Sequence, residues 1–154
     1  AENYLCKHFG DRSYILRLAP VYSNNFFLNI NRRVRFCSIN YIVGKGLTKI
    51  SMCNMENIVF AVKGILDNKV PSDIYNISDT TTYSYTDLHS WSNNKFLVPV
   101  PEIIVKIFYF FGFIINNIFL KENMAKLISS NLYPSKKFQQ YTKLPYNLND
   151  CEYS

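Results

Sequence analysis

One stretch decides the fold: Ser13-Tyr14-Ile15-Leu16-Arg17-Leu18-Ala19-Pro20-Val21-Tyr22, residues 13–22. It is rich in β-branched and aromatic residues, and Pro20 interrupts it near its end. A short apolar run bounded in this way is typical of a buried strand that leads into a loop. We therefore predict a buried strand here, with Ser23-Asn24-Asn25 as the loop that follows.

The residues before this stretch predict a helix. Apolar and charged residues alternate over 1–7 as in the later turns of an amphipathic helix, and Gly10 stands where such a helix would stop. The first residue is alanine rather than methionine. We expect residue 1 to lie inside a helix that begins earlier, so that residues before it would pack against this helix.

Downstream, predicted strands and helices alternate, which indicates an α/β fold. Asn54 and Ser84 precede apolar-periodic segments and can cap helices there, and Pro101 suits the first turn of another helix. Gly44-Lys45-Gly46 predicts a tight turn between two strands that would form a hairpin. The expected elements are helices at 26–34, 55–66, 85–93 and from 101 onward, and strands or extended segments at 39–43, 47–52, 74–77 and 96–100.

The segment 101–120 is almost wholly apolar and has about the length that a bilayer-spanning helix needs. Lys106, Gly112 and Asn116-Asn117 interrupt it and weigh against insertion. The favoured interpretation is two shorter helices, at 101–115 and 121–130, that pack on a protein partner. An anchor at 103–120 is kept as the alternative.

Composition narrows the class of protein. The 154 residues are 48% hydrophobic and 18% charged, which fits one globular domain or part of one and excludes disorder, collagen and coiled coil. Because hydrophobic residues are many and charged residues few, we predict that part of the apolar surface packs against a further layer of protein. A net charge of +6 suits phosphate-bearing ligands, whereas Arg32, Arg33 and Arg35 form no long basic run, so no nucleic-acid binding is predicted.

Most motifs that mark metal-binding, phosphate-binding or catalytic sites are missing from the sequence. The four cysteines form no CxxC and there are only two histidines, so we predict no metal site, reduced thiols and a cytoplasmic location. With five glycines the chain contains neither GxGxxG nor GxxxxGK[ST]. Tyr-x-x-x-Lys occurs at Tyr41/Lys45 and at Tyr133/Lys137, a spacing that places both side chains on one face of a helix. The first match ends in a glycine turn and the second has a proline directly after its tyrosine, which argues against a shared helical face. No catalytic residue is therefore predicted.

Six motifs occur in an order that matches a known family. They are Ala1-Glu2-Asn3-Tyr4-Leu5, Leu16-Arg17-Leu18-Ala19-Pro20-Val21-Tyr22, Lys49-Ile50-Ser51 with Asn54 to Ala61, Tyr75-Asn76-Ile77-Ser78-Asp79, Ser84-x-x-Asp87-Leu88, and Pro99-x-Pro101 with Ser135-Lys136-Lys137-Phe138. In this order the chain resembles the C-terminal half of an extended short-chain dehydrogenase/reductase of the NAD-dependent sugar-nucleotide epimerase/dehydratase family, similar to UDP-glucose 4-epimerase-like proteins. Ser23 replaces a family glycine, and Pro20 stands where many such epimerases carry asparagine.

The resemblance implies the C-terminal part of a Rossmann-type NAD(P)-binding fold with its small substrate-binding lobe, the N-terminal βα units being absent. It implies residues 1–150 as the substrate-side portion and 151–154 as a tail. By resemblance, the nicotinamide ring of NAD contacts Leu18, Ala19, Pro20 and Val21. A nucleotide-diphosphate sugar contacts Tyr22, Ser23, Asn24 and Lys49.

Three functions are consistent with this sequence. The first is a fragment of a sugar-nucleotide epimerase/dehydratase that lacks the glycine-rich fingerprint and the catalytic Ser/Tyr/Lys, inactive alone, whose partner would be the missing N-terminal half or a second copy. The second is a non-enzymatic binding or scaffolding module. The third is the membrane-associated protein anchored by 103–120.

Overall fold

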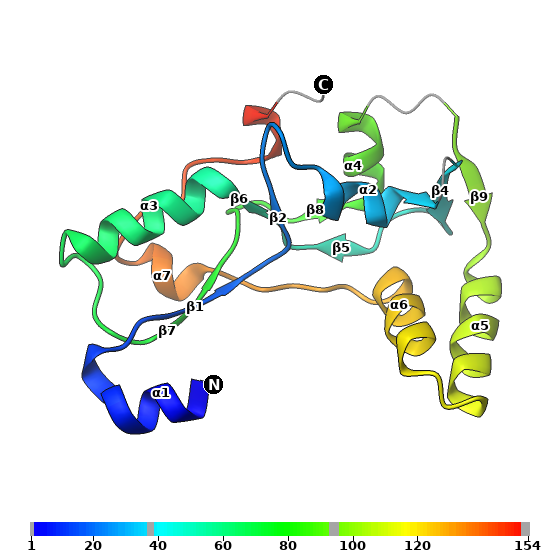
Figure 1. Cartoon of the computed structure of the whole chain (residues 1–154). Coiled ribbons are helices and arrows are strands. Elements are labelled where there is room, and N and C mark those ends of the chain that lie inside the picture. Colours follow the sequence, from blue (N-terminus) through cyan, green and yellow to red (C-terminus); the bar gives the residue numbers. More distant parts are fainter. Residues whose placement is uncertain (1, 37–38, 93–95, 152–154) are drawn as a thin grey trace. The chain divides into compact units, whose positions relative to one another are not determined.

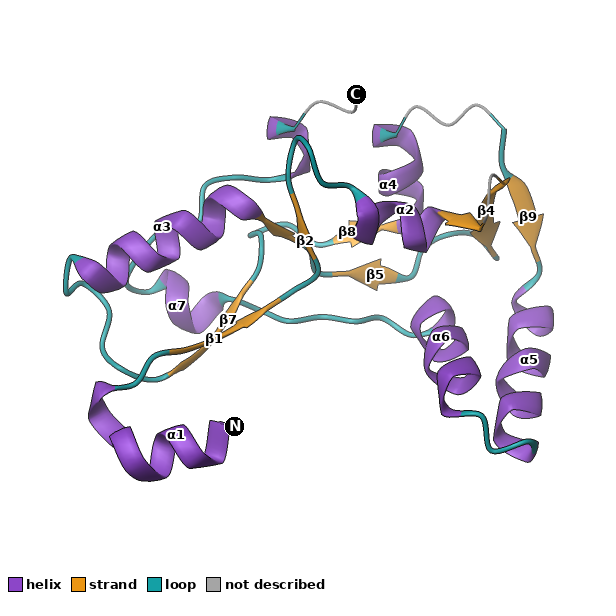
Figure 2. Ribbon diagram, in the orientation of Figure 1, coloured by secondary structure: helices purple, strands orange, loops and turns teal. Residues whose placement is uncertain are grey.

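The computed structural model describes residues 2–36, 39–92 and 96–151. Helices and strands alternate along the chain, which confirms the α/β class (Figures 1 and 2). The described residues fall into two compact units that interleave in sequence. Unit 1 takes residues up to 23, 51–81 and 133–151, and unit 2 takes 24–50 and 82–132 apart from the undescribed positions.

Unit 1 contains the predicted strand of residues 13–22 as two short strands. β1 (Ile15–Leu18) pairs in parallel with β7 (Ile74–Ile77), and β2 (Val21–Tyr22) pairs in parallel with β6 (Cys53–Asn54). The break falls at Ala19-Pro20, because proline has no N–H to donate to a ladder. The neighbouring groups still bond, since Ala19 N donates to Ile77 O at 3.0 Å and Pro20 O accepts from Cys53 N at 3.0 Å.

Within its described residues, unit 1 has five helical elements, of which two were predicted: the helix that ends near Gly10 and the helix at 55–66. They are α1 (Glu2–Phe9), the 3-10 turn η1 (Gly10–Arg12), α3 (Met55–Leu66), α7 (Lys136–Gln139) and the 3-10 turn η2 (Leu148–Asp150). Gly10 has a φ of +35°, a conformation that favours glycine and ends α1 as expected. Asn54 caps α3 by accepting from Glu56 N at 3.0 Å, which confirms the predicted cap.

The core of unit 1 lies between the strands, α3 and α7. Its buried members are Ala19, Cys53, Ala61, Val70, Tyr75, Ile77, Phe138 and Leu144. The rings of Tyr75 and Phe138 meet edge to face with their centroids 5.3 Å apart. Burial of these apolar groups is the main term that stabilises unit 1.

Unit 2 is built on a three-stranded sheet of order β3-β4-β9. Its elements are α2 (Leu28–Val34), β3 (Arg35–Phe36), β4 (Ile39–Val43), β5 (Lys49–Ile50), β8 (Tyr83–Ser84), α4 (Tyr85–Trp91), β9 (Val98–Val100), α5 (Glu102–Ile114) and α6 (Ile118–Ile128). Ser84 caps α4 in a capping box with Asp87, as the sequence predicted.

The predicted hairpin of 39–43 with 47–52 is wrong. The turn at 44–46 forms, with Gly46 N donating to Val43 O at 2.9 Å, but β4 pairs in parallel with β9 and antiparallel with β3. Gly44 N continues the β9 ladder by donating to Val100 O at 2.9 Å. β5 pairs antiparallel with β8 instead. Because β9 and β8 lie far along the chain, a local turn signal could not reveal these partners.

The apolar segment 101–120 forms a helical hairpin of α5 and α6, close to the two shorter helices that were favoured. The turn contains Asn116, whose φ is +52°, and Asn117, whose side chain caps α6 by accepting from Leu120 N at 3.0 Å. Gly112 lets the helices approach, because a Cβ there would lie 3.2 Å from Leu120. Among the described residues, no helix has both the length and the apolar character needed to cross a bilayer.

The buried His89 makes the stability of unit 2 depend on pH. Its Nε2 lies 2.8 Å from Tyr41 O and therefore donates, since a carbonyl only accepts, while Nδ1 is buried without a hydrogen-bond partner among the described residues. Burial lowers the pKa of His89, with the hydrogen bond to Tyr41 opposing it. The unfolded histidine, with a pKa near 6.5, therefore binds a proton that the folded one resists.

We expect the free energy of unfolding to fall as the pH drops from about 7 to about 5, because the unfolded state gains the proton in this window. His89→Gln, which keeps a donor for Tyr41 O, should flatten the profile. Urea denaturation at several pH values measures this. Equal slopes for wild type and His89→Gln would contradict the assignment.

Candidate functional site

The predicted cofactor loop lies at the carboxyl ends of two parallel strands. Leu18 ends β1 beside Ile77, which ends β7, and the chain then turns through Ala19-Pro20 into β2. In open α/β sheets, ligands bind at the carboxyl ends of the strands. Leu18 exposes 46% of its surface and Ala19 only 1%. The loop thus presents an apolar face made of Leu18 and the proline ring.

A buried carboxylate, Asp79, holds the loop and its neighbours in place. Asp79 follows β7 and is 4% exposed. Its Oδ2 accepts from Tyr22 Oη at 2.6 Å, and its Oδ1 accepts from Asn54 N at 2.7 Å and from Asn57 Nδ2 at 2.9 Å. A buried carboxylate needs such donors, because desolvation penalises its charge. Asp79 therefore joins β2, β6 and α3 at one point.

Asn57 extends this network to the last part of the chain. Its Oδ1 accepts from Tyr146 N at 3.0 Å, and its Nδ2 donates to Tyr146 O at 2.8 Å. It is fully buried, like Tyr22. Asn54 Nδ2 lies 3.4 Å from Cys151 Sγ, a second link to this region. We name Tyr22, Asn54, Asn57, Asp79 and the backbone of Tyr146 the Asp79 network.

Asp79 was not predicted as part of the site. The signal was present, since Asp79 ends the motif Tyr75-Asn76-Ile77-Ser78-Asp79 and is a carboxylate placed just after a buried strand. Asn57, in the first turn of α3, could be interpreted from the sequence equally well as a functional residue or as part of a helix cap. Their pairing joins positions 22 residues apart and is a property of the fold.

The predicted substrate residues fall in two places. Tyr22 and Ser23 lie in unit 1 with the loop, whereas Asn24 and Lys49 belong to unit 2. The side chain of Tyr22 is fully buried with its hydroxyl on Asp79, so it serves the Asp79 network. Ser23 is half-buried, and Asn24 and Lys49 are exposed. Their contact with a substrate stays a prediction.

Lys49 lies near the cap of α4. The pKa of Asp87 is lowered first by hydrogen bonds from Ser84 N and Oγ, and Lys49 adds an attractive charge. The backbone of Lys49 bonds to the segment after α6, with its O accepting from Asn131 N at 3.0 Å. The exposed ammonium can bind a phosphate as a point charge but cannot grip it through two parallel bonds as arginine does.

Neither Tyr-x-x-x-Lys match forms a helical pair. Tyr41 lies on β4 and Lys45 in the turn after it, while Tyr133 precedes α7, which contains Lys137. Burial raises the pKa of Tyr41 to about 12, with the nearby Tyr85 adding to the effect. Burial likewise raises the pKa of the Cys53 thiol to about 12. Among the described residues, no group of three or more His, Cys, Asp or Glu could hold a metal ion.

Comparisons with known proteins bear on the fold. No protein-family profile matches the chain, and no curated protein matches its sequence significantly. UDP-glucuronic acid 4-epimerase from Bacillus cereus, solved with UDP-glucuronic acid and NAD, matches 96% of this chain with a TM-score of 0.58 and 15% identity. Human epimerase family protein SDR39U1 (isoform 2), solved with NADPH, matches 90% with a TM-score of 0.55 and 12% identity.

This chain spans 45% of the length of each of those two structures. The likeness confirms the expected fold, an α/β arrangement with parallel strands like that of the epimerases of the short-chain dehydrogenase/reductase type. It also places this chain on less than half of such a protein. Function must be argued from the site itself, because one fold supports many activities.

Proposed function

We propose that the chain is the substrate-side portion of an NAD-dependent sugar-nucleotide epimerase/dehydratase. One observation carries the proposal: the loop 18–23, which matches the family motif, lies at the carboxyl ends of β1 and β7, where ligands of such sheets bind. The fold likeness to UDP-glucuronic acid 4-epimerase over 96% of the chain supports it.

The loop fits one end of the cofactor. Leu18 is half exposed and Pro20 has no N–H, so the loop offers an apolar surface to the face of a nicotinamide ring. Ala19 donates its N–H to Ile77 O, which fixes the loop backbone. The five glycines form no phosphate-binding fingerprint. The chain therefore suits the nicotinamide end and leaves the pyrophosphate to other residues.

NAD, when bound, supplies the hydride acceptor for reversible oxidation of a sugar carbon. The role of this chain is to position the ligands: Leu18 to Val21 contact the nicotinamide ring, and the hydroxyl of Ser23, in the same unit, contacts the sugar. The Asp79 network keeps the loop rigid, and rigid support is what a binding site requires. We expect no turnover by the 154-residue chain alone, because it supplies no Ser/Tyr/Lys set.

Saturation-transfer NMR on the 154-residue chain tests this proposal. We expect saturation to reach the sugar protons of UDP-glucuronic acid and the nicotinamide protons of NAD. Leu18→Asp puts a charge on the apolar face of the loop and should abolish the transfer to NAD. Leu66→Asp, at a more exposed position on α3, is the matched control and should not. Absence of transfer to both ligands, or equal effects of the two variants, would overturn the proposal.

A further inference from the structure

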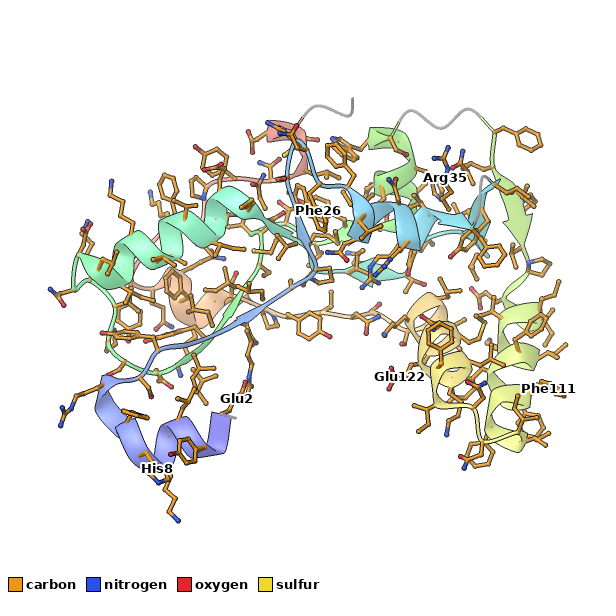
Figure 3. The ribbon with its side chains drawn as sticks, in the orientation of Figure 1. Glu2, His8, Phe26, Arg35, Phe111 and Glu122 are labelled. Atoms are coloured by element: carbon orange, nitrogen blue, oxygen red, sulfur yellow. The ribbon has the colours of Figure 1, made fainter. Side chains whose placement is uncertain are left out.

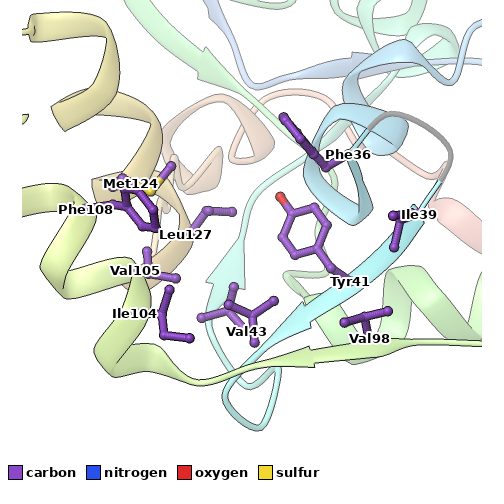
Figure 4. Close-up of a pocket in the computed structure, with 11 residues that line it drawn as sticks. Phe36, Ile39, Tyr41, Val43, Val98, Ile104, Val105, Phe108, Met124 and Leu127 are labelled. Atoms are coloured by element: carbon purple, nitrogen blue, oxygen red, sulfur yellow. The ribbon is translucent and has the colours of Figure 1, made fainter.

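Unit 2 contains two adjoining cavities on the side of its sheet that faces α5 and α6 (Figure 4). Their volumes are about 320 and 710 Å³, within the range of small-molecule sites. They share five lining residues and therefore adjoin one another, and the pair is here called the groove. The shared residues are Phe36, Tyr41, Phe108, Met124 and Leu127.

The smaller cavity, here called the apolar cavity, is lined by hydrocarbon. Figure 4 shows Val43 and Tyr41 of β4 opposite Ile104, Val105 and Phe108 of α5. Among the described residues that line it, Tyr41 supplies the only polar side-chain group, its hydroxyl. A cavity without charged or amide groups favours an alkyl chain over a sugar or a base, because unpaired polar atoms of such a ligand would lose their water.

The larger cavity, here called the basic cavity, adds positive charge. Arg32 and Arg33 of α2 and Lys126 of α6 line it together with the amides of Asn29 and Asn123. No Asp or Glu is found in the described part of its lining. Between described residues, no carboxylate lies within 4.0 Å of Arg32 or Arg33, and the ammonium of Lys126 lies 3.8 Å from Glu122.

Arg33 lies near two tyrosines, the buried Tyr85 and the half-buried Tyr41. Burial raises the pKa of Tyr85, and a hydrogen bond and charge from Arg33 oppose that rise. The Tyr85 hydroxyl donates to Lys126 O at 3.0 Å, which links α4 to α6. Arg33 also lies close enough to Tyr41 to act on its pKa. Arg33 lines the basic cavity, and Tyr41 lines both cavities.

We propose that this groove binds a free single-chain amphiphilic anion. Its alkyl chain occupies the apolar cavity, and its carboxylate or phosphate head lies in the basic cavity at Arg32 and Arg33. Two arginines can hold either head through paired, charge-assisted bonds. This proposal concerns unit 2 and is independent of the function proposed for the loop 18–23.

Isothermal titration of the 154-residue chain with dodecanoate, below the concentration at which it self-associates, tests the ligand class. We expect saturable binding of dodecanoate. Butyrate has the head without the chain, and dodecyltrimethylammonium has the chain with the opposite charge, so both should bind at least about tenfold more weakly.

Matched variants test the location of the site. Phe108→Glu places a negative charge in the wall that both cavities share and should abolish binding of dodecanoate. Phe111→Glu is its control, because Phe111 lies on the same helix, lines neither cavity and is similarly exposed, 53% against 51% for Phe108 (Figure 3). Arg32→Gln should weaken binding about tenfold, whereas Arg35→Gln, outside both linings, should not.

Three results would overturn the proposal. The first is equal binding of dodecanoate and dodecyltrimethylammonium, which would show that the groove binds alkyl chains without regard to the charge of the head group. The second is an equal loss in Phe108→Glu and Phe111→Glu. The third is no heat with dodecanoate while the chain sediments with anionic phospholipid vesicles, which would assign the exposed face of α5 to a bilayer surface. Circular dichroism of each variant confirms that it is folded.

Discussion

Replacing Asp79 by alanine lowers the free energy of unfolding of unit 1 by about 3–5 kcal/mol, because three buried donors lose their acceptor and each unsatisfied donor costs about 1–3 kcal/mol. The donors are Tyr22 Oη, Asn54 N and Asn57 Nδ2. Water cannot replace the carboxylate at low cost, since Tyr22 and Asn57 are fully buried. The effect should appear as a lower urea midpoint.

Two further variants make this measurement specific. Asp67→Ala removes an exposed carboxylate that pairs with Lys69 at 3.0 Å, and it should cost at most about 0.5 kcal/mol. Asp79→Asn keeps one acceptor oxygen and should fall between alanine and wild type. If Asp79→Ala cost no more than Asp67→Ala, the network would not support the loop as described.

Replacing Gly64 by alanine should destabilise unit 1 by about 1–3 kcal/mol, the usual cost of overpacking. Gly64 lies in α3, where alanine would ordinarily add about 1 kcal/mol of stability through its helix propensity. A Cβ at this position would lie 2.6 Å from Thr142 Oγ1 and 3.1 Å from Thr142 Cγ2. Both atoms belong to a short side chain, which cannot swing away.

A double-mutant cycle isolates this contact. Thr142 Oγ1 is buried without a hydrogen-bond partner among the described residues, so Thr142→Ala should be tolerated well. In that background Gly64→Ala should recover at least about 1 kcal/mol of its cost, a coupling typical of residues in contact. Lys63→Ala, on the exposed part of α3, should show no coupling. Additive effects of Gly64→Ala and Thr142→Ala would rule out the proposed clash.

The sequence predicted the local features of the fold well. Asn54, Ser84 and Gly10 act on groups a few residues away, so their roles as caps or stops could be inferred without knowing the rest of the chain. The division of 101–120 into two helices was also visible in Asn116-Asn117. These signals depend on neighbouring residues, which any single sequence displays.

Features that join distant segments were harder to predict. The hairpin expected after β4 was wrong because β9, more than fifty residues away, offered a parallel partner. At the site, the order of motifs located the loop 18–23, but not the buried carboxylate of Asp79 that supports it. A carboxylate is buried only where several donors converge, and that convergence exists only in the folded chain.

The Asp79 network also sets the order in which unit 1 can be completed. The bond of Asp79 to Tyr22 spans 57 residues, and those of Asn57 to Tyr146 span 89. Contacts between residues so far apart in sequence form slowly, because a large loop must close first. On the ribosome, residues 2–81 can assemble the β1–β7 pair and the bonds that Asp79 accepts, but Asn57 lacks the backbone groups of Tyr146 until that residue has emerged. Until then the Asp79 network is incomplete at Asn57, and a partly assembled state of this kind is more exposed to misfolding than the finished unit.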